Sequence, residues 1–254
     1  MQSAAALSAR LAKLSSKEQA RGMKKHISPL RGIRGVSGSG ITEVINLAWK
    51  TGVHLDDADD EDELHSLFTT AYEDGLVAIG LAAAALPDDP ETGLSLARRW
   101  LAITDDIQTA DALGWLMWGP ALLSGAGKGP SALLDARSSD EFERRAAVIA
   151  LLSALPVPIE GPAASGLRAR LKLRRVAFVE SALDELLEEV LPAYLRDDNP
   201  QVRKAVARVA REWAACSPDA AEAAVKDPGG LHRVVRADLE KGLKKGRRPK
   251  KKRS

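Results

Sequence analysis

The chain has 254 residues, of which 45% are hydrophobic, and its formal net charge at pH 7 is only +2. This hydrophobic content excludes a disordered chain, and the single cysteine, Cys216, excludes both a disulfide framework and a zinc site built from several cysteines. The 42 Ala and 34 Leu residues favour helix over strand, so we expect an all-α protein. No run of about 18 apolar residues occurs, so we expect no membrane span.

The small net charge is the average of two unlike regions. Residues 241–254 carry nine basic side chains and no acid, whereas residues 1–240 carry 28 basic and 35 acidic side chains. A segment that is this basic, and that contains Gly246 and Pro249, cannot bury an apolar face. We therefore expect a disordered tail at 246–254, which either keeps the protein soluble or attracts phosphates.

The first predicted element is an amphipathic helix near the N-terminus, with Leu7, Leu11 and Leu14 on one face. The segment lacks the apolar core of a secretory signal, so none is expected. Residues 28–40 are rich in glycine and are predicted to form a loop. These glycines do not follow a predicted strand, which argues against a nucleotide-binding loop.

A helix is predicted from Ile41 to about Lys50. Residues 56–63 contain seven acids in eight positions and are interpreted as a solvated loop followed by the acidic first turn of a helix. Consecutive acids lack the alternating spacing of a calcium loop, and the four histidines are scattered, so no metal or cofactor is expected. Further helices are predicted at about 60–73, 75–86, 91–103, 106–118, 139–155, 177–191, 200–215, 218–226 and 231–245.

Helix pairs that recur every 35 to 45 residues indicate an α-solenoid. The clearest unit is LPAYLRDDNPQVRKAVARVAREWAA at 191–215, which has the pattern of a HEAT-type repeat. In it Asp198 or Asn199 caps the second helix, Pro200 begins it, and small alanines allow close packing. We therefore predict one HEAT-like helical-repeat domain over residues 1–245.

Five segments, taken in order, resemble the DNA alkylation repair family, the AlkD-like alkylpurine DNA glycosylases. They are KEQARGMKKHISPLRGIRGVSGSGI, LARRWLAITDDIQTADALGWLMWGPALL, SSDEFERRAAVIALL, DDNPQVRKAVARVAREWAACSPDAA and LHRVVRADLEKGL. The resemblance implies a curved stack of helix pairs whose basic concave surface holds duplex DNA. It also implies an activity, the removal of 3-methyl or 7-methyl purines by cleavage of the N-glycosidic bond. The implied partner is damaged double-stranded DNA, bound by a cytoplasmic, nucleoid-associated monomer.

The resemblance also implies roles for individual residues. Asp111 matches the catalytic carboxylate of the family. Ile107 and Arg208 stand where the family has aromatic rings, so Trp115 and Trp118 are the candidate cleft aromatics, and Trp213 is a further one. The candidate DNA contacts are the basic side chains Arg144, Arg145, Arg203, Lys204, Arg208 and Arg211. Of these, Arg144, Arg145 and Arg211 match arginines of the family, whereas Arg203 and Lys204 form one of several basic pairs in the sequence. Such pairs either contact phosphates from one concave groove or are solvated and pair with local acids. The basic stretch 168–175 is either a groove-edge contact or the exposed start of a helix.

Independently of the family, Asp111 stands out in its helix. Residues 107–118 are apolar nearly all round, so this helix should be buried. A buried carboxylate must either pair with a cation or line a cleft. Asp111 is therefore either a structural partner of an arginine on a neighbouring helix or a cleft carboxylate. The sequence accordingly leaves two functions open, a glycosylase that acts through Asp111 and a HEAT-like scaffold that binds DNA or protein without catalysis.

Overall fold

The computed structural model describes residues 2–27, 29–52, 57–127, 130–155, 157, 180–225 and 230–247. Within these ranges every regular element is a helix, which confirms the all-α prediction. The α-helices are α1 (Ala4–Lys13), α2 (Lys17–Met23), α3 (Gly38–Trp49), α4 (Ala58–Thr70), α5 (Tyr72–Ala85), α6 (Pro90–Leu101), α7 (Ile107–Leu113), α8 (Gly119–Leu123), α9 (Pro130–Asp135), α10 (Glu141–Ala150), α12 (Glu180–Tyr194), α13 (Pro200–Cys216), α14 (Pro218–Ala224) and α15 (Arg233–Gly246). None of the helices described has the length and apolar composition that crossing a bilayer requires.

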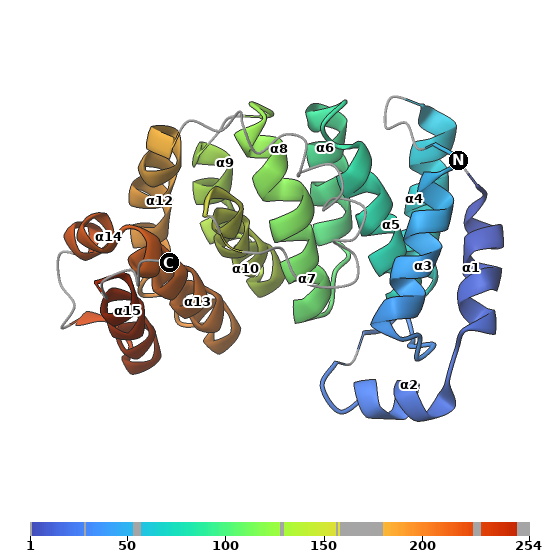
Figure 1. The fold of residues 1–254 in the computed structure, drawn as a ribbon, viewed down its shortest axis with the longest axis horizontal. Coiled ribbons are helices and arrows are strands. Elements are labelled where there is room, and N and C mark those ends of the chain that lie inside the picture. Colours follow the sequence, from blue (N-terminus) through green and yellow to red (C-terminus); the bar gives the residue numbers. More distant parts are fainter. Residues whose placement is uncertain are drawn as a thin grey trace, which may run out of the picture.

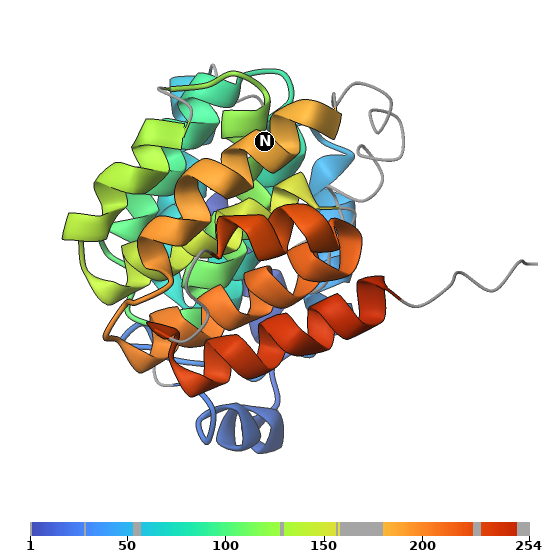
Figure 2. The same ribbon diagram turned by 90° about the vertical axis from the view of Figure 1, so that its left-hand side faces the viewer.

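The helices follow one another in a curved row from α1 to α15, and α2 lies across one end of it (Figure 1). At the other end, α12, α13 and α15 lie in successive layers, with α13 packed along α15 (Figure 2). Contacts between α4 and α5 and between α10 and α13 join neighbours along the row. Most helices of the row thus bury their apolar faces against neighbouring helices, as in a repeat protein.

Local sequence signals begin several of these helices as predicted. The Asn199 side chain accepts hydrogen bonds from the backbone N–H groups of Gln201 and Val202, and Pro200 is the first residue of α13. Asp57 caps α4, and acidic residues fill its first turn, where their negative charges interact favourably with the positive end of the helix dipole.

Among the described residues no cluster of His, Cys, Asp or Glu could hold a metal ion.

The core combines large apolar side chains with many alanines. All of α5, from Tyr72 to Ala85, is buried, and four consecutive alanines at 82–85 let neighbouring helices approach it closely. The helix predicted at 106–118 continues to Leu123 through a π-helical turn, η1 (Gly114–Trp118). The helix α9 was not predicted from the sequence. A short 3-10 turn, η2 (Ala136–Ser138), follows α9, and another, η3 (Leu151–Ala154), follows α10.

The glycine-rich segment before α3 is fixed by acids at the start of α5. The buried Glu73 carboxylate accepts the backbone N–H groups of Arg34, Gly35 and Val36 at 2.9, 2.7 and 3.1 Å. The Arg34 guanidinium pairs with both carboxylate oxygens of Asp74. Gly35 has a φ of +78° and lies so close to the Ser16 carbonyl that a Cβ would be 2.2 Å from it. This segment therefore has one fixed path, which leads into α3, and α3 packs against α5.

Candidate functional site

A groove of about 940 Å³ lies where α2 and α3 face α5, α7, η1 and α13. Its described lining residues come from distant parts of the chain. They are Gln19, Gly22, Met23, His26, Val36, Ser37, Gly38, Ile41, Tyr72, Leu76, Gln108, Asp111, Ala112, Trp115, Leu116 and Arg208. Asp111 is the one carboxylate and Arg208 the one guanidinium in this set. The groove is therefore mainly apolar, with one negative and one positive group in it.

The Asp111 carboxylate is both in the groove and paired with a cation. Arg145, on α10, donates from Nε to Oδ1 at 2.6 Å and from Nη2 to Oδ2 at 2.8 Å. The Asp111 side chain is 24% exposed, and that of Arg145 is 10% exposed. The Arg145 guanidinium also donates to the Gln201 carbonyl, at the start of α13. Both possibilities that the sequence left open for Asp111 are thus present together, because it lines a cleft and is held by an arginine.

The electrostatic surroundings of Asp111 are mixed. Burial raises the pKa of the Asp111 carboxyl above its ordinary value, while the hydrogen bonds from Arg145 and the charges of Arg145 and Arg208 act in the opposite direction. The bidentate pair fixes the plane of the carboxylate, because both oxygens are held by one rigid guanidinium. The groove therefore presents a carboxylate of defined orientation, whose negative charge is balanced by the positive charge of Arg145.

Close helix packing produces this pairing. A Cβ on Gly114 would lie 2.3 Å from the Ala146 carbonyl, so α10 lies directly against η1. A Cβ on Gly119 would likewise lie 2.4 Å from the Ala150 carbonyl oxygen. Short π-helical turns are rare and are often found at functional sites, and this one begins three residues after Asp111. The absence of side chains at the two glycines brings Arg145 within reach of Asp111.

Two aromatic residues line the groove, and only one of them was predicted from the sequence. Trp115, on η1, is 5% exposed, and the Arg208 guanidinium lies over its ring with Cζ 4.7 Å from the centroid. Tyr72 donates its hydroxyl to Oε1 of Gln108 at 2.5 Å, and burial raises the pKa of this phenol. Nothing in the sequence around Tyr72 distinguished it from a core residue. It becomes a lining residue only because α5 lies beside α7.

The other predicted aromatics are placed away from the groove. Trp118 is fully buried and does not line it, so the prediction of Trp118 as a cleft aromatic is corrected. Trp115 and Trp118 are three positions apart, but the π-helical turn between them changes the face that each side chain occupies. Trp213 is 1% exposed and belongs to the core.

The predicted basic contacts fall into two groups. Arg144 bonds to Asp197 at 2.9 Å and to the Ser139 carbonyl at 2.7 Å, and Arg211 is held by Glu212. With Arg145, these arginines are engaged by acids of the protein. The second group lies along α13, where Lys204 is exposed and Arg203 and Arg208 are half-buried. The basic stretch 168–175, most of the tail (248–254) and His54 lie outside the described residues.

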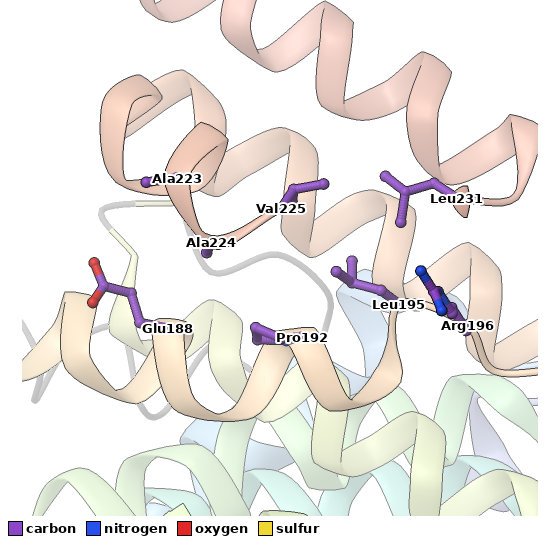
Figure 3. Close-up of a pocket in the computed structure, with 8 residues that line it drawn as sticks. All are labelled: Glu188, Pro192, Leu195, Arg196, Ala223, Ala224, Val225 and Leu231. Carbon is purple, nitrogen blue, oxygen red and sulfur yellow. The ribbon is translucent and has the colours of Figure 1, made fainter. Parts of the chain in front are cut away.

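A second cavity, of about 670 Å³, lies between α12 and the segment from α14 to α15 (Figure 3). Most of its described lining is apolar, with Pro192, Leu195, Val225 and Leu231 between Glu188 and Arg196 (Figure 3). It shares no lining residue with the groove at Asp111. It offers no convergent set of polar groups, so the groove at Asp111 is the candidate functional site.

The chain matches a known protein family. The family described as DNA alkylation repair enzyme matches the chain over residues 7–240. This range includes every described residue that lines the groove and ends just before the basic segment 241–254. No curated protein matches the chain.

Proposed function

The chain belongs to the DNA alkylation repair enzyme family, and we propose that it excises alkylated purines from duplex DNA, with Asp111 as the carboxylate that acts at the sugar. Family membership itself supports a role in DNA repair. The finer proposal depends on one observation, the oriented Asp111 carboxylate in a groove that also contains the face of Trp115. Duplex DNA is the partner, and it is bound by one copy of the chain.

The proposed chemistry requires little more than a well-placed negative charge. A purine alkylated at N3 or N7 is a cation in the nucleotide, so the bond between C1′ and N9 can break without a proton donor. The bonding electrons leave with the base, which departs neutral, and an oxocarbenium ion remains on the sugar until water adds to C1′ and loses a proton. A carboxylate fixed near C1′ stabilises that cation in the transition state. One carboxylate therefore suffices, unlike the two that glycosidases use.

A second function is favoured by the same ion pair. Arg145 neutralises much of the Asp111 charge, and Ile107 and Arg208 occupy positions where the resemblance implies aromatic rings. Each missing ring would remove about 1–2 kcal/mol of cation–π attraction from a charged transition state. The alternative proposal is therefore a scaffold that binds DNA in this groove and does not cleave the glycosidic bond.

The test uses a duplex that contains one 7-methylguanine. We expect the wild type to release the base and Asp111→Asn to be slower by about two or more decades, because the variant lacks the stabilising charge. Loss of the carboxylate also leaves Arg145 without its partner, so chemical unfolding of the variant must be measured alongside. Trp115→Phe is a companion variant that keeps a ring in the groove and leaves the ion pair intact, so it separates the contribution of the indole from that of the carboxylate.

Three outcomes of this experiment would each count against part or all of these proposals. Base release by the wild type that is equal in Asp111→Asn would contradict the role of Asp111. Tight, salt-dependent binding of the duplex without base release would support the scaffold. No duplex binding at low salt would contradict both.

A further inference from the structure

The Tyr72–Gln108 pair gives the groove a hydrogen-bond donor that the proposed chemistry does not use. Tyr72, on α5, is 2% exposed, and its hydroxyl donates to Oε1 of Gln108 at 2.5 Å. Burial raises the pKa of this phenol, so it stays protonated and remains a donor. Because Oε1 is engaged by a buried donor, the NH2 group is the end of the Gln108 amide that is left for the groove. Among the described residues this NH2 group makes no hydrogen bond.

Gln108 stands one helical turn from the Asp111 carboxylate. The two residues are three positions apart on α7 and both line the groove, so they lie on one face of the helix. Side chains at this spacing have Cβ atoms about 5–6 Å apart. The backbone of the same turn offers less, because Asp106 Oδ1 accepts the N–H groups of Gln108 and Thr109. The Gln108 side chain is therefore the donor that this turn of α7 presents to the groove.

A phosphate oxygen of the DNA backbone fits this donor. Side-chain amides are common phosphate contacts, and a hydrogen bond to a charged oxygen is stronger than one between neutral groups. Arg144, Arg145 and Arg211, which were expected to bind phosphates, are engaged by acids of the protein. A neutral amide also holds a phosphate without adding a second positive charge beside Asp111. The negative charge that acts at the sugar in the proposed chemistry is therefore not reduced further.

We propose that Gln108 donates from Nε2 to a phosphate next to the damaged nucleotide, and that Tyr72 is a positioning residue, which keeps this donor turned toward the groove. The inference rests on the proposed function and specifies how one nucleotide is brought into register with Asp111. The C1′ atom of a nucleotide and its phosphates are joined through a single sugar ring. A phosphate fixed one helical turn from Asp111 therefore brings the sugar of that nucleotide to the carboxylate.

The experiment measures affinity for a duplex with one 7-methylguanine on a 2′-fluorinated sugar, which resists cleavage. In a series of such duplexes, a neutral methylphosphonate replaces one phosphate at a time around that nucleotide. Gln108→Ala should bind the all-phosphate duplex about three- to tenfold more weakly, with an unchanged salt slope because the lost contact is neutral. At one position next to the damaged nucleotide, the methylphosphonate should weaken Gln108→Ala about three- to tenfold less than it weakens the wild type.

A second variant separates the contact from folding. Gln108→Ala leaves the buried Tyr72 hydroxyl without its acceptor, so its unfolding by urea is measured alongside. Gln108→Glu keeps an oxygen for that hydroxyl and replaces the donor by a negatively charged oxygen. It should bind the all-phosphate duplex at least as weakly as Gln108→Ala, because this oxygen repels the phosphate. The methylphosphonate at the same position should weaken it less than it weakens the wild type.

Tyr72→Phe tests the positioning role. An amide that turns freely presents its donor only part of the time, so this variant should lose about two- to fivefold in affinity. The loss should vanish in the Gln108→Ala background, because Tyr72 acts through Gln108. Gln19→Ala is the matched control, since it removes another glutamine of the groove lining, from α2. Its effect on affinity should add to that of Tyr72→Phe.

Equal effects of every methylphosphonate on the wild type and on Gln108→Ala would overturn the phosphate contact. A loss in Tyr72→Phe that persists in the Gln108→Ala background would overturn the positioning role. Both results leave the proposed function standing, because base release and its dependence on Asp111 are measured separately. Failure of the wild type to bind any duplex would overturn the proposed function together with this inference.

Discussion

At the residue scale, Asp111 combines two features that the sequence could only offer as alternatives. Its position in an apolar helix required either a cationic partner or a cleft, and the structure supplies Arg145 as the partner and the groove as the cleft. The identity of that partner was beyond sequence reasoning, because Arg144 and Arg145 are adjacent and only the packing of α10 decides which one faces α7. Arg144 faces Asp197 instead.

A pH dependence of stability is expected from His65. Its Nδ1 accepts a hydrogen bond from Nε1 of Trp100 at 3.1 Å, which requires the neutral imidazole. Burial and the charge of Arg99 lower the pKa of His65 below its ordinary value of 6.5. Because the pKa is lower in the folded state, the unfolded chain binds a proton at His65 more readily as the pH falls through about 6.5. The free energy of unfolding therefore keeps its full value above about pH 6.5 and decreases as the pH falls below it.

Urea unfolding of the wild type and of His65→Gln, measured between about pH 7.5 and pH 5, tests this expectation. The wild type should lose stability over this interval, and the variant should lose less because it lacks the titrating ring. The remaining histidines are common to both proteins and cancel in the comparison. Equal pH dependence in the two proteins would contradict the role of His65.

At the scale of elements, the glycines of the segment α7–η1–α8 determine how closely it lies on α10. The alanine side chains of α5 and α10 contribute to the same close packing on the two sides of this segment. The sequence showed that these helices are apolar and rich in small residues, but the π-helical turn was not predicted. That turn separates Trp115, which lines the groove, from Trp118, which is buried.

Gly114→Ala should therefore be strongly destabilising. The new Cβ would lie 2.3 Å from the Ala146 carbonyl, so α10 would have to move away from η1. We expect a loss of about 2–3 kcal/mol in the free energy of unfolding, as is usual for overpacking in a dense core. Weaker pairing of Asp111 with Arg145 should accompany it, because both sides of that pair depend on the same contact.

The matched control for this variant is Gly22→Ala on α2, where no atom lies within 4 Å of the added Cβ. That substitution should leave stability unchanged or raise it by up to about 1 kcal/mol, because alanine is the better helix former. Denaturant midpoints of the two variants against the wild type give the comparison. Similar midpoints for Gly114→Ala and Gly22→Ala would show that the close approach to Ala146 does not matter.

At the scale of the whole molecule, the curvature of the row brings α2 and α13 to one groove (Figure 1). Gln19 and Arg208 both line it, although 188 residues lie between them in the sequence. The predicted boundary of the tail is also refined here. The helix α15 extends to Gly246, and Arg247 pairs with Glu222 on α14, so the folded part includes two residues that were assigned to the tail.

The basic tail is expected to contribute to DNA affinity. Residues 248–254 contain five basic side chains and no acid. Their deletion should weaken duplex binding and reduce the slope of log affinity against log salt concentration by up to about 4–5 units, since each phosphate contact releases about 0.9 counterion. Titrations at several salt concentrations measure both quantities, with unfolding by urea as the control for α15. Unchanged affinity and slope would mean that the tail serves solubility alone.

The sequence by itself determined the all-α class, the approximate positions of most helices and the need of Asp111 for a cationic partner or a cleft. These features depend on local rules, such as apolar periodicity, proline and side-chain caps at helix starts, and the cost of an unpaired buried charge. Only the tertiary structure decided that Arg145 holds Asp111, that Trp115 and Tyr72 rather than Trp118 line the groove, and that Arg208 covers Trp115. Those contacts join residues far apart in the chain, and they depend on curvature, a π-helical turn and glycine-mediated packing, which no local pattern specifies.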